Sequence, residues 1–548
     1  MNPSETRPAA NEIISFTVGE AGNVRHHASG EAPPPRPAVP KFNWRLERPL
    51  GWILLAGLLL RLALFGAVWL HSPDLSATHY PDSSGYLDPA ASLVAHGEFS
   101  RGGVPELLRT PGYPLLLAIG TALGHVELVT VLLQTLLSLV TIAAVYYIAL
   151  SLTGNRRAAI VAAGLFAIEP LSLIYTSYLM AETLFGCLVA LMVAALVRYG
   201  RSDSFIPLVL GAALLAAATL VRPISYFLPP LVALALLGRG ILRAETRQRA
   251  MIAALLFLVV SHGPAVAWRT RNWLVAGYNG YSAVSALNMY YFQGASVVAA
   301  LKHESLEEAQ REFGGFSVDF IPERFYELHP ELRSASQAEI YRFMQRAGSK
   351  LVRENPLVYA KVHLRGLTTL LLNPGAPDLL ALLRRLPNSL IREHRVESGL
   401  WDIVVQMHRQ TPSILYTNLV LAGVLGLIYL AATVGCLGFV RRPNWQLVPV
   451  LLVAGYLLAI AGGPTCIARL RAPAMPLACV LSGVGVAELL RLRKGRSSND
   501  SRNNDPRQQP DEADFAAWAA EVATMRRATA AAPVAAIPGK FDSSEQFS

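Results

Sequence analysis

Charged residues are scarce in this sequence of 548 residues: Lys, Arg, Asp and Glu make up 16% of it, whereas soluble domains carry about a quarter. Hydrophobic residues account for 53%, and the mean hydropathy is +0.37. So little charge cannot cover a globule of this size with polar surface, which excludes a soluble enzyme. A disordered chain is excluded as well, because such chains are poor in apolar residues. The composition therefore predicts a polytopic membrane protein.

Cysteine and nucleotide-binding motifs are also scarce. The four cysteines lie in apolar stretches without paired spacing, so neither a disulfide framework nor a zinc site is expected. The sequence has no Walker loop and no Gly-x-Gly-x-x-Gly motif followed by an acidic residue, the usual devices for binding ATP or a nucleotide sugar. Histidines are scattered without the spacing of metal ligands. Neither a cofactor nor a metal is therefore predicted.

Ten apolar stretches are long enough to cross a bilayer, which takes about 20 helical residues. They lie at about 50–70, 127–152, 157–174, 182–199, 204–221, 223–239, 250–267, 414–438, 446–462 and 473–490. The predicted fold is all-α and polytopic, with a transmembrane domain over 49–490. Residues 1–48, with a Pro-rich stretch at 33–37, are expected to form a disordered cytoplasmic leader. Residues 491–548 are expected to form a mostly disordered cytoplasmic tail with one short helix near 511–530.

Basic residues predict how these spans are oriented. If ten spans are drawn, all the large clusters fall on one side: 41–48, 156–157, 198–201, 239–249, 441–442 and 491–496. Lys and Arg concentrate in cytoplasmic loops, so both termini are expected in the cytoplasm of a cell with the protein in its inner (plasma) membrane. The formal charge of +10 is then explained by topology, and no nucleic acid partner is expected.

Two large segments, about 71–126 and 268–413, then lie on the outer side. Within the second, residues 336–372 have a helical, amphipathic pattern. This pattern predicts helices that lie along the outer membrane face.

Asp82 is the most informative residue of the first outer segment. It follows the first span by about a dozen residues, which puts its carboxylate close to the outer membrane surface. Two interpretations stand side by side. Asp82 or Ser83 could cap a short helix that ends near Leu93, or Asp82 could form a site together with Arg109.

Three further charges lie in or beside apolar spans. Arg61 is midway along the first span, where a charge marks either function or a buried ion pair. Glu169 ends the third span and Glu182 opens the fourth, and both are expected to face the same outer cavity as Asp82. The alternative for Glu182 is a favourable interaction with the positive end of its helix.

Arginines also occur on the outer side, which the topology rule disfavours. They are Arg222, Arg269, Arg271, Arg469 and Arg471. A guanidinium binds phosphate oxygens in a bidentate manner, so outer arginines beside apolar helices suit a phosphate held at the membrane surface. The alternative is contact with ordinary lipid headgroups.

Four short motifs together resemble a known family. Residues 81–86 (Pro-Asp-Ser-Ser-Gly-Tyr) and 109–114 (Arg-Thr-Pro-Gly-Tyr-Pro) look like the first outer loop of the polytopic GT-C glycosyltransferases, most like bacterial members related to aminoarabinose transferase and protein O-mannosyltransferases. Residues 268–273 (Trp-Arg-Thr-Arg-Asn-Trp) resemble their outer Arg-Asn motif, and 469–473 (Arg-Leu-Arg-Ala-Pro) their final Arg-x-Arg-x-Pro motif. Ser83 departs from the Asp-Glu pair of many protein O-mannosyltransferases, which argues against transfer to protein.

The resemblance implies transfer of a sugar from a polyprenyl-phosphate carrier to an acceptor on the outer (periplasmic) face, beside the membrane lipids. Asp82 matches the family's catalytic base. The resemblance assigns the donor phosphate to five arginines: Arg109, Arg269, Arg271, Arg469 and Arg471. Substrate binding is predicted for Glu182, Tyr86, Tyr113 and Arg61.

The residues make this chemistry coherent. A polyprenyl phosphate leaves as a phosphate monoester, which needs charge stabilisation more than protonation, and arginines supply it without a metal. Asp82 would accept the proton of the incoming group, and a single displacement would invert the anomeric carbon.

The rival interpretation is a polytopic transporter or lipid flippase without glycosyl transfer. An assembly protein whose arginines anchor headgroups is a third.

Overall fold

The structure is a computed structural model that describes residues 47–202, 204–242, 247–317, 320–384, 412–465 and 467–503. The leader predicted before residue 47 and the short helix predicted near 511–530 lie outside these residues. Within them the chain is almost entirely helical, with one two-stranded hairpin, β1 (Ser100–Arg101) and β2 (Val104–Pro105). The all-α prediction is confirmed.

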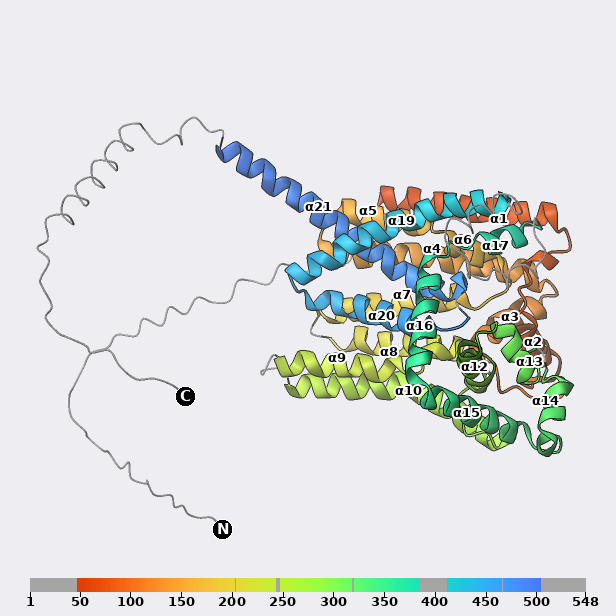
Figure 1. The fold of residues 1–548 in the computed structure, drawn as a ribbon. Helices are drawn as coiled ribbons and strands as arrows, with labels where there is room; N and C mark the ends of the chain where they lie inside the picture. The colour runs from red at the N-terminus through yellow and green to blue at the C-terminus, as the bar shows by residue number, and fades with distance from the viewer. Residues whose placement is uncertain are drawn as a thin grey trace, which may run out of the picture. The chain divides into compact units, whose positions relative to one another are not determined.

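Seven helical segments of the described chain are long and apolar enough to cross a membrane (Figure 1). They are α1 (Arg48–His71), α4 (Val126–Thr153), α7 (Glu182–Tyr199), the segment Pro223–Gly240 with η2 (Pro223–Ser225) and most of α9 (Leu228–Leu242), α10 (Arg247–Ala276), α19 (Pro412–Arg441), and the segment Ala468–Arg493 formed by η8 (Ala468–Ala474) and most of α21 (Met475–Asn503). The other predicted spans fall on shorter or broken helices: α5 (Arg156–Ala167) with α6 (Pro170–Ser177), α8 (Ile206–Val221), and η7 (Trp445–Leu447) with α20 (Val448–Ala461). The polytopic fold is therefore confirmed.

The third predicted span, 157–174, is not a single helix. It divides into α5 and α6, which meet at an angle of 47°. Pro170 is the first residue of α6, and a proline disfavours helical backbone in the residue before it; Glu169 is accordingly extended, with φ −63° and ψ 123°. The Glu169 carboxylate then caps α6 by accepting a bond from the Ser172 backbone N–H at 2.6 Å.

The predicted basic clusters meet at one end of the bundle. Arg156 at the start of α5 pairs with Glu47 before α1 at 2.8 Å. Arg201 after α7 donates to Gln446 in η7 at 3.1 Å, and Arg239 in α9 donates to the Gly200 carbonyl at 3.3 Å. These helix ends lie on the left in Figure 1. The clusters therefore share one end, as the topology rule requires; their cytoplasmic location stays a prediction.

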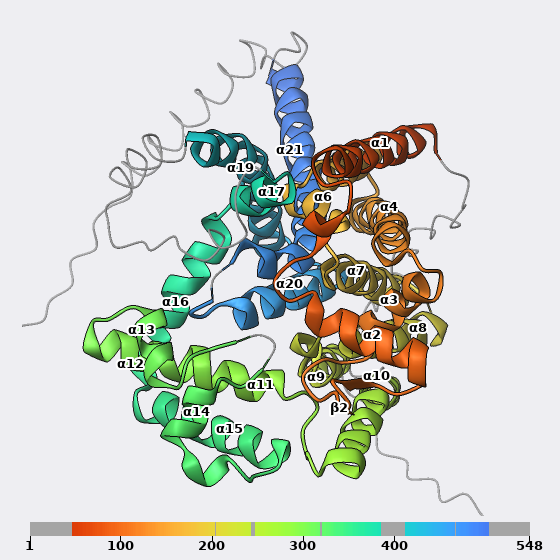
Figure 2. The same ribbon diagram turned by 90° about the vertical axis from the view of Figure 1, so that its right-hand side faces the viewer.

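The two large segments that were predicted on the outer side form the opposite end of the bundle, on the right in Figure 1. The first contains η1 (Ser76–Thr78), α2 (Ser84–His96), the hairpin and α3 (Gly112–Ala122). The second contains α11 (Val284–Leu287), the π-helical turn η4 (Asn288–Gly294), α12 (Ala295–Lys302), α13 (Leu306–Glu312), α14 (Glu323–Leu328), η5 (Pro330–Leu332), α15 (Gln337–Glu354), α16 (Pro356–Leu372) and α17 (Ala376–Leu382). Figure 2 shows α11 to α15 grouped beside α10, away from α1 and α19.

Helix α15 was expected to lie along the membrane face, yet its apolar side packs on protein. Ile340, Tyr341 and Met344 are buried in a small aromatic core with Tyr290 of η4. Gly348 permits this approach, because a Cβ atom there would clash with the Met289 carbonyl oxygen. The apolar side of the amphipathic helix α15 is therefore the side that packs on η4.

Candidate active site

Arg469 is the centre of a charged cluster at the end of the bundle opposite the basic clusters. Its guanidinium donates to Asp82 at 2.6 Å and lies 3.3 Å from the Glu182 carboxylate. It also stacks on Tyr80, with the central guanidinium carbon 4.9 Å from the ring centroid. Arg469 is in η8, Asp82 precedes α2 and Glu182 opens α7, so three distant parts of the sequence meet on one side chain.

A second arginine neutralises Glu182. Arg222, which ends α8, donates to the Glu182 carboxylate at 2.8 Å. The side chain of Glu182 is only 1% exposed. A buried carboxylate is costly unless it is paired, and here Arg222 and Arg469 supply the opposite charge. The sequence singled out Arg222 as an outer-side arginine but assigned it no role in the site.

Arg109 approaches Asp82 from the far side. Its guanidinium lies 3.4 Å from the Asp82 carboxylate and 4.5 Å from the Tyr86 ring centroid. Gly85 makes room for it, because a Cβ atom there would lie 2.9 Å from the Arg109 Nε. Asp82 therefore stands between Arg109 and Arg469, and its side chain, 20% exposed, remains open to solvent.

The loop that carries Asp82 is fastened to the segment that carries Glu182. The Ser83 hydroxyl donates to the Leu179 carbonyl at 2.9 Å, and the Leu179 N–H donates to the Thr78 carbonyl at 2.9 Å. Ser83 precedes the first residue of α2 but makes no side-chain capping bond. Ser83 therefore occupies the position before α2 that the capping interpretation gave to Asp82 or Ser83. The Asp82 carboxylate instead contacts Arg109 and Arg469, and its role in a site stays a prediction.

The turn that carries Arg109 is held by Glu106 and Arg271. The Glu106 carboxylate accepts the Arg109 backbone N–H at 2.9 Å, and burial raises the pKa of this carboxyl group. Arg271 donates to the Glu106 and Phe99 carbonyls, each at 2.8 Å. Thr110 adds a bond to the Val221 carbonyl at 3.2 Å, next to Arg222. These bonds bring the first outer segment onto the ends of α8 and α10.

The structure does not bring the other three predicted phosphate-binding arginines to Asp82. Arg271 holds the Arg109 turn, and Arg269 donates to Asn279 at 2.8 Å on an exposed surface. Arg471 is 1% exposed and donates to the carbonyls of Leu370, Leu371 and Asn373 at the end of α16. Arg469 and Arg471, two residues apart, thus face different surroundings.

Two predicted substrate-binding residues are also buried by protein groups. Arg61 is fully buried and donates to Ser138 at 2.8 Å and to the Gly57 and Ala167 carbonyls. Tyr113 donates to Gln134 at 2.9 Å. Its ring packs edge-on against Tyr86, with centroids 5.1 Å apart, so it supports Tyr86 from behind. Glu169 is fully buried as the cap of α6 rather than beside Asp82.

Asp378 belongs to the same region and no sequence signal pointed to it. It lies in α17, and its carboxylate accepts a bond from the Tyr175 hydroxyl at 2.9 Å. Burial raises the pKa of Asp378 to about 6, against the effect of this bond and of Arg469. A lone Asp in an outer segment of more than a hundred residues shows no pattern, so its position could only come from the fold.

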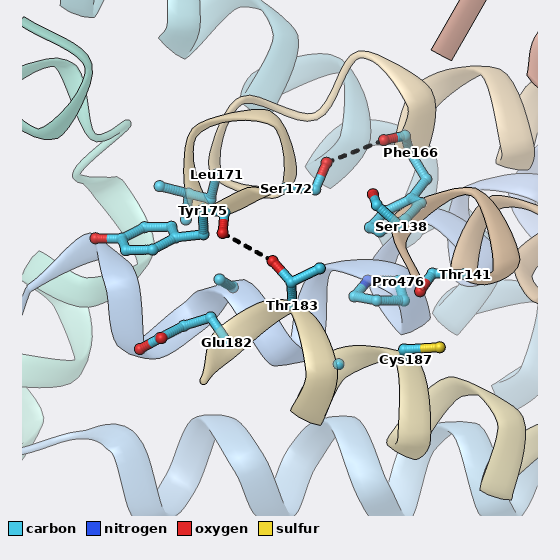
Figure 3. Close-up of a pocket in the computed structure, with 12 residues that line it drawn as sticks. Ser138, Thr141, Phe166, Leu171, Ser172, Tyr175, Glu182, Thr183, Cys187 and Pro476 are labelled. Carbon is cyan, nitrogen blue, oxygen red and sulfur yellow. Dashed lines mark hydrogen bonds between the residues drawn. The ribbon is translucent and has the colours of Figure 1, made fainter. Parts of the chain in front are cut away.

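A small cavity lies behind Glu182 and Tyr175 (Figure 3). Both side chains extend away from Ser138 and Thr141 on its far wall. Its hydroxyl lining suits ordered water, and none of the described arginines of the cluster contributes to that lining. The cavity therefore shares Glu182 with the charged cluster, whereas Asp82 is not among the residues that line it.

Comparison with known proteins bears on this arrangement. Residues 108–268 match the family described as dolichyl-phosphate-mannose-protein mannosyltransferase. The matched segment contains Arg109, Glu182 and Arg222 of the cluster. A search of curated sequences found no significant match. The resemblance to glycosyltransferases that use lipid-phosphate sugars is confirmed over this segment.

Solved structures with a similar chain course were also found. The archaeal oligosaccharyltransferase AglB from Archaeoglobus fulgidus, solved with an inhibitory peptide and a dolichol-phosphate, is 13% identical with a TM-score of 0.41; the match covers 84% of this chain but only 54% of AglB. ArnT from Cupriavidus metallidurans bound to undecaprenyl phosphate is 15% identical with a TM-score of 0.34, and the match covers 81% and 79% of the two chains.

Proposed function

We propose that this protein is a membrane glycosyltransferase that moves a sugar from a polyprenyl-phosphate carrier to an acceptor at the outer membrane surface. The observation that carries the proposal is the pairing of the partly exposed Asp82 with Arg469 and Arg109, backed by the buried pair of Glu182 and Arg222. One carboxylate open to solvent between two guanidinium groups offers both a proton acceptor and an anion site.

The proposed reaction is a single displacement. The bond between the anomeric carbon and the phosphate oxygen breaks, and its electron pair stays on the polyprenyl phosphate. The acceptor oxygen or nitrogen forms the new bond from the opposite face, so the anomeric carbon inverts, and its proton passes to Asp82. Arg469 and Arg109 would stabilise the charge that grows on the leaving phosphate.

Binding of the donor to Arg469 would also free the proposed base, Asp82, from its ion pair with this arginine. Its guanidinium is engaged by Asp82 and Glu182 in this structure. A donor phosphate that bound Arg469 would compete with Asp82 for the same N–H groups. The freed carboxylate would then meet the acceptor, so proton transfer would wait for the donor.

Transfer by the purified protein in detergent tests the proposal. We expect product from a polyprenyl-phosphate sugar and a lipid, glycan or protein acceptor, because an enzyme needs no membrane barrier. A comparison of lipid-linked glycans from cells with and without the protein would supply the candidate donors. A protein that forms no product with these donors, but moves lipid across proteoliposome membranes, would instead be the flippase of the rival interpretation.

Cysteine labelling of intact cells tests the proposed orientation. We expect an impermeant thiol reagent to label cysteines placed at 82, 271 and 323 in a cysteine-free background, and to spare those at 156, 198, 243, 441 and 493 until the cells are permeabilised. The reason is the basic end of the bundle, which should stay in the cytoplasm. Labelling of the second set in intact cells would overturn both the orientation and the outer-face donor site.

A further inference from the structure

Helix α16 exposes three leucines on one of its sides. Leu357, Leu364 and Leu372 are 77%, 64% and 67% exposed. Successive residues of a helix are turned by about 100°, so these three positions lie on the same side of α16. Lys361 and Arg365 are exposed on that side as well. Together the five residues form a stripe that is both apolar and basic.

The opposite side of α16 packs on the protein. Gly366 and Leu370 are buried there, and the His363 ring donates to the Ala459 carbonyl of α20 at 2.9 Å. At about 100° per residue, these positions lie half a turn away from the leucine stripe. The stripe therefore points away from the helices on which α16 packs.

Exposed apolar residues on the neighbouring helices continue this surface. Ile460, which follows Ala459 in α20, is exposed. On the other side, the Tyr429 hydroxyl of α19 donates to the Leu371 carbonyl at 2.9 Å, and the next residue of α19, Leu430, is exposed. A large contiguous apolar surface marks contact with a partner or a membrane, and α19 is long and apolar enough to cross the membrane.

The direction of α16 fits a helix in the plane of the membrane. Figure 1 shows that α16 runs across the direction of α10 and α20, and Figure 2 shows it at the edge of the bundle. A helix in this orientation can bury an apolar side at the boundary between acyl chains and headgroups. Lysine and arginine can lay their aliphatic stems along the acyl chains while their charges reach the headgroups.

We propose that α16 is an interfacial helix: its leucine stripe enters the membrane, and Lys361 and Arg365 bind the phosphate of anionic phospholipids. Two positive charges within one turn of an apolar stripe complement a lipid that carries net negative charge beside its acyl chains. The phosphate of phosphatidylcholine is offset by its own amine, so an anionic headgroup is the better fit. This inference does not depend on the proposed function.

Bound lipid would also secure the segment that carries Arg469. Arg471, two residues further along η8, donates to the carbonyls of Leu370, Leu371 and Asn373 at the end of α16. A membrane that holds α16 therefore holds the backbone on which η8 is fastened. A ligand that binds only the folded state stabilises it, so anionic lipid should raise the melting temperature of the protein.

Titration with a fluorescent phosphatidylglycerol, in micelles of an uncharged detergent, tests the two charges. A basic residue beside an anionic surface contributes a factor of about five in affinity. Lys361→Gln combined with Arg365→Gln should therefore weaken binding by about 25-fold. Fluorescent phosphatidylcholine should bind the parent and this variant alike.

The matched control removes two exposed charges elsewhere at the same end of the bundle. Lys302→Gln combined with Arg324→Gln alters α12 and α14 and should leave the affinity for phosphatidylglycerol at the parental value. Parental affinity in the α16 variant, or an equal loss in the control, would overturn the anionic lipid site.

Spin labels test the insertion of the leucine stripe without any change to Lys361 or Arg365. The protein is placed in vesicles of phosphatidylcholine and phosphatidylglycerol, with cysteines at 357, 364 and 372 in a cysteine-free background. We expect these labels to collide more with oxygen, which dissolves in lipid, than with a water-soluble nickel complex. A label at the exposed position 307 in α13 should show the reverse. Stripe labels that behave like the label at 307 would overturn the interfacial helix, because the stripe would then face water.

Decaprenyl phosphate, titrated on the same variants, separates this lipid site from the proposed donor site. Its affinity should be unchanged by Lys361→Gln combined with Arg365→Gln, because neither side chain belongs to the cluster around Arg469. A loss as large as that for phosphatidylglycerol would overturn the separate lipid site. None of these measurements needs transfer of a sugar, so a protein without transferase activity would overturn the proposed function and leave this inference in place.

Discussion

Asp82→Asn should lower turnover by about 10² or more, with protein yield and thermal stability close to the parent. Asparagine keeps the shape and an oxygen that can accept from Arg469, but it cannot take a proton from the acceptor. Loss of the Asp82 charge should cost little stability, because the Arg469 guanidinium still pairs with the Glu182 carboxylate. Initial-rate kinetics with a polyprenyl-phosphate donor measure the effect, and a melting curve of the same preparation measures stability.

Asp88→Asn is the matched control for this variant. Asp88 lies in α2 six residues after Asp82, and its half-exposed side chain pairs with Arg101 at 3.1 Å. An exposed ion pair contributes little to stability, so this change should leave both rate and stability unaltered. Near-parental transfer by Asp82→Asn would remove Asp82 from the chemistry and leave Glu182 as the nearest alternative carboxylate.

Arg469→Lys should lower turnover by about 10-fold to 100-fold despite the preserved charge. One guanidinium contacts Asp82, Glu182 and the Tyr80 ring together, and a lysine ammonium cannot reproduce that planar set of contacts. The loss should appear in kcat more than in KM, because negative charge grows on the leaving oxygen in the transition state. Steady-state kinetics over a range of donor concentrations separate the two.

Arg471→Lys provides the contrast two residues away. Because Arg471 donates to three carbonyls that end α16, its replacement should lower the melting temperature and the yield of folded protein. The fraction that folds should still turn over within a few-fold of the parent rate. If instead Arg469→Lys behaved like the parent and Arg471→Lys lost turnover without loss of stability, the phosphate site would have to be reassigned to Arg471.

Much of the architecture is predictable from the sequence, because membrane spans are set by local composition. A run of about 20 apolar residues is unstable in water and sufficient to cross the hydrocarbon, so the ten stretches could be identified one by one. Arg156, Arg201 and Arg239 lie at the same end of the bundle because successive spans run in opposite directions. Even the break of the third span is local in origin: Pro170 disfavours helix at Glu169.

The helix α15 shows where this local reasoning stops. Its amphipathic pattern identifies an apolar face but not the partner that covers it. Membrane lipid and the aromatic residues of η4 both satisfy the same pattern. Only the fold showed that Tyr290 and its neighbours cover that face.

The sequence by itself determined that this is a helical membrane protein whose two large segments between spans carry an Asp and several arginines in an order that resembles a known class of transferase. Only the tertiary structure decided which of them meet. Arg469 and Asp82 are 387 positions apart, and their contact depends on how η8, α7 and the first outer segment pack. That packing brings in Arg222 and Asp378 and turns Arg271 and Arg471 to backbone carbonyls. The N–H groups of a guanidinium can donate to a phosphate, a carboxylate or a carbonyl, so the role of each arginine is fixed by the groups that the fold places within its reach.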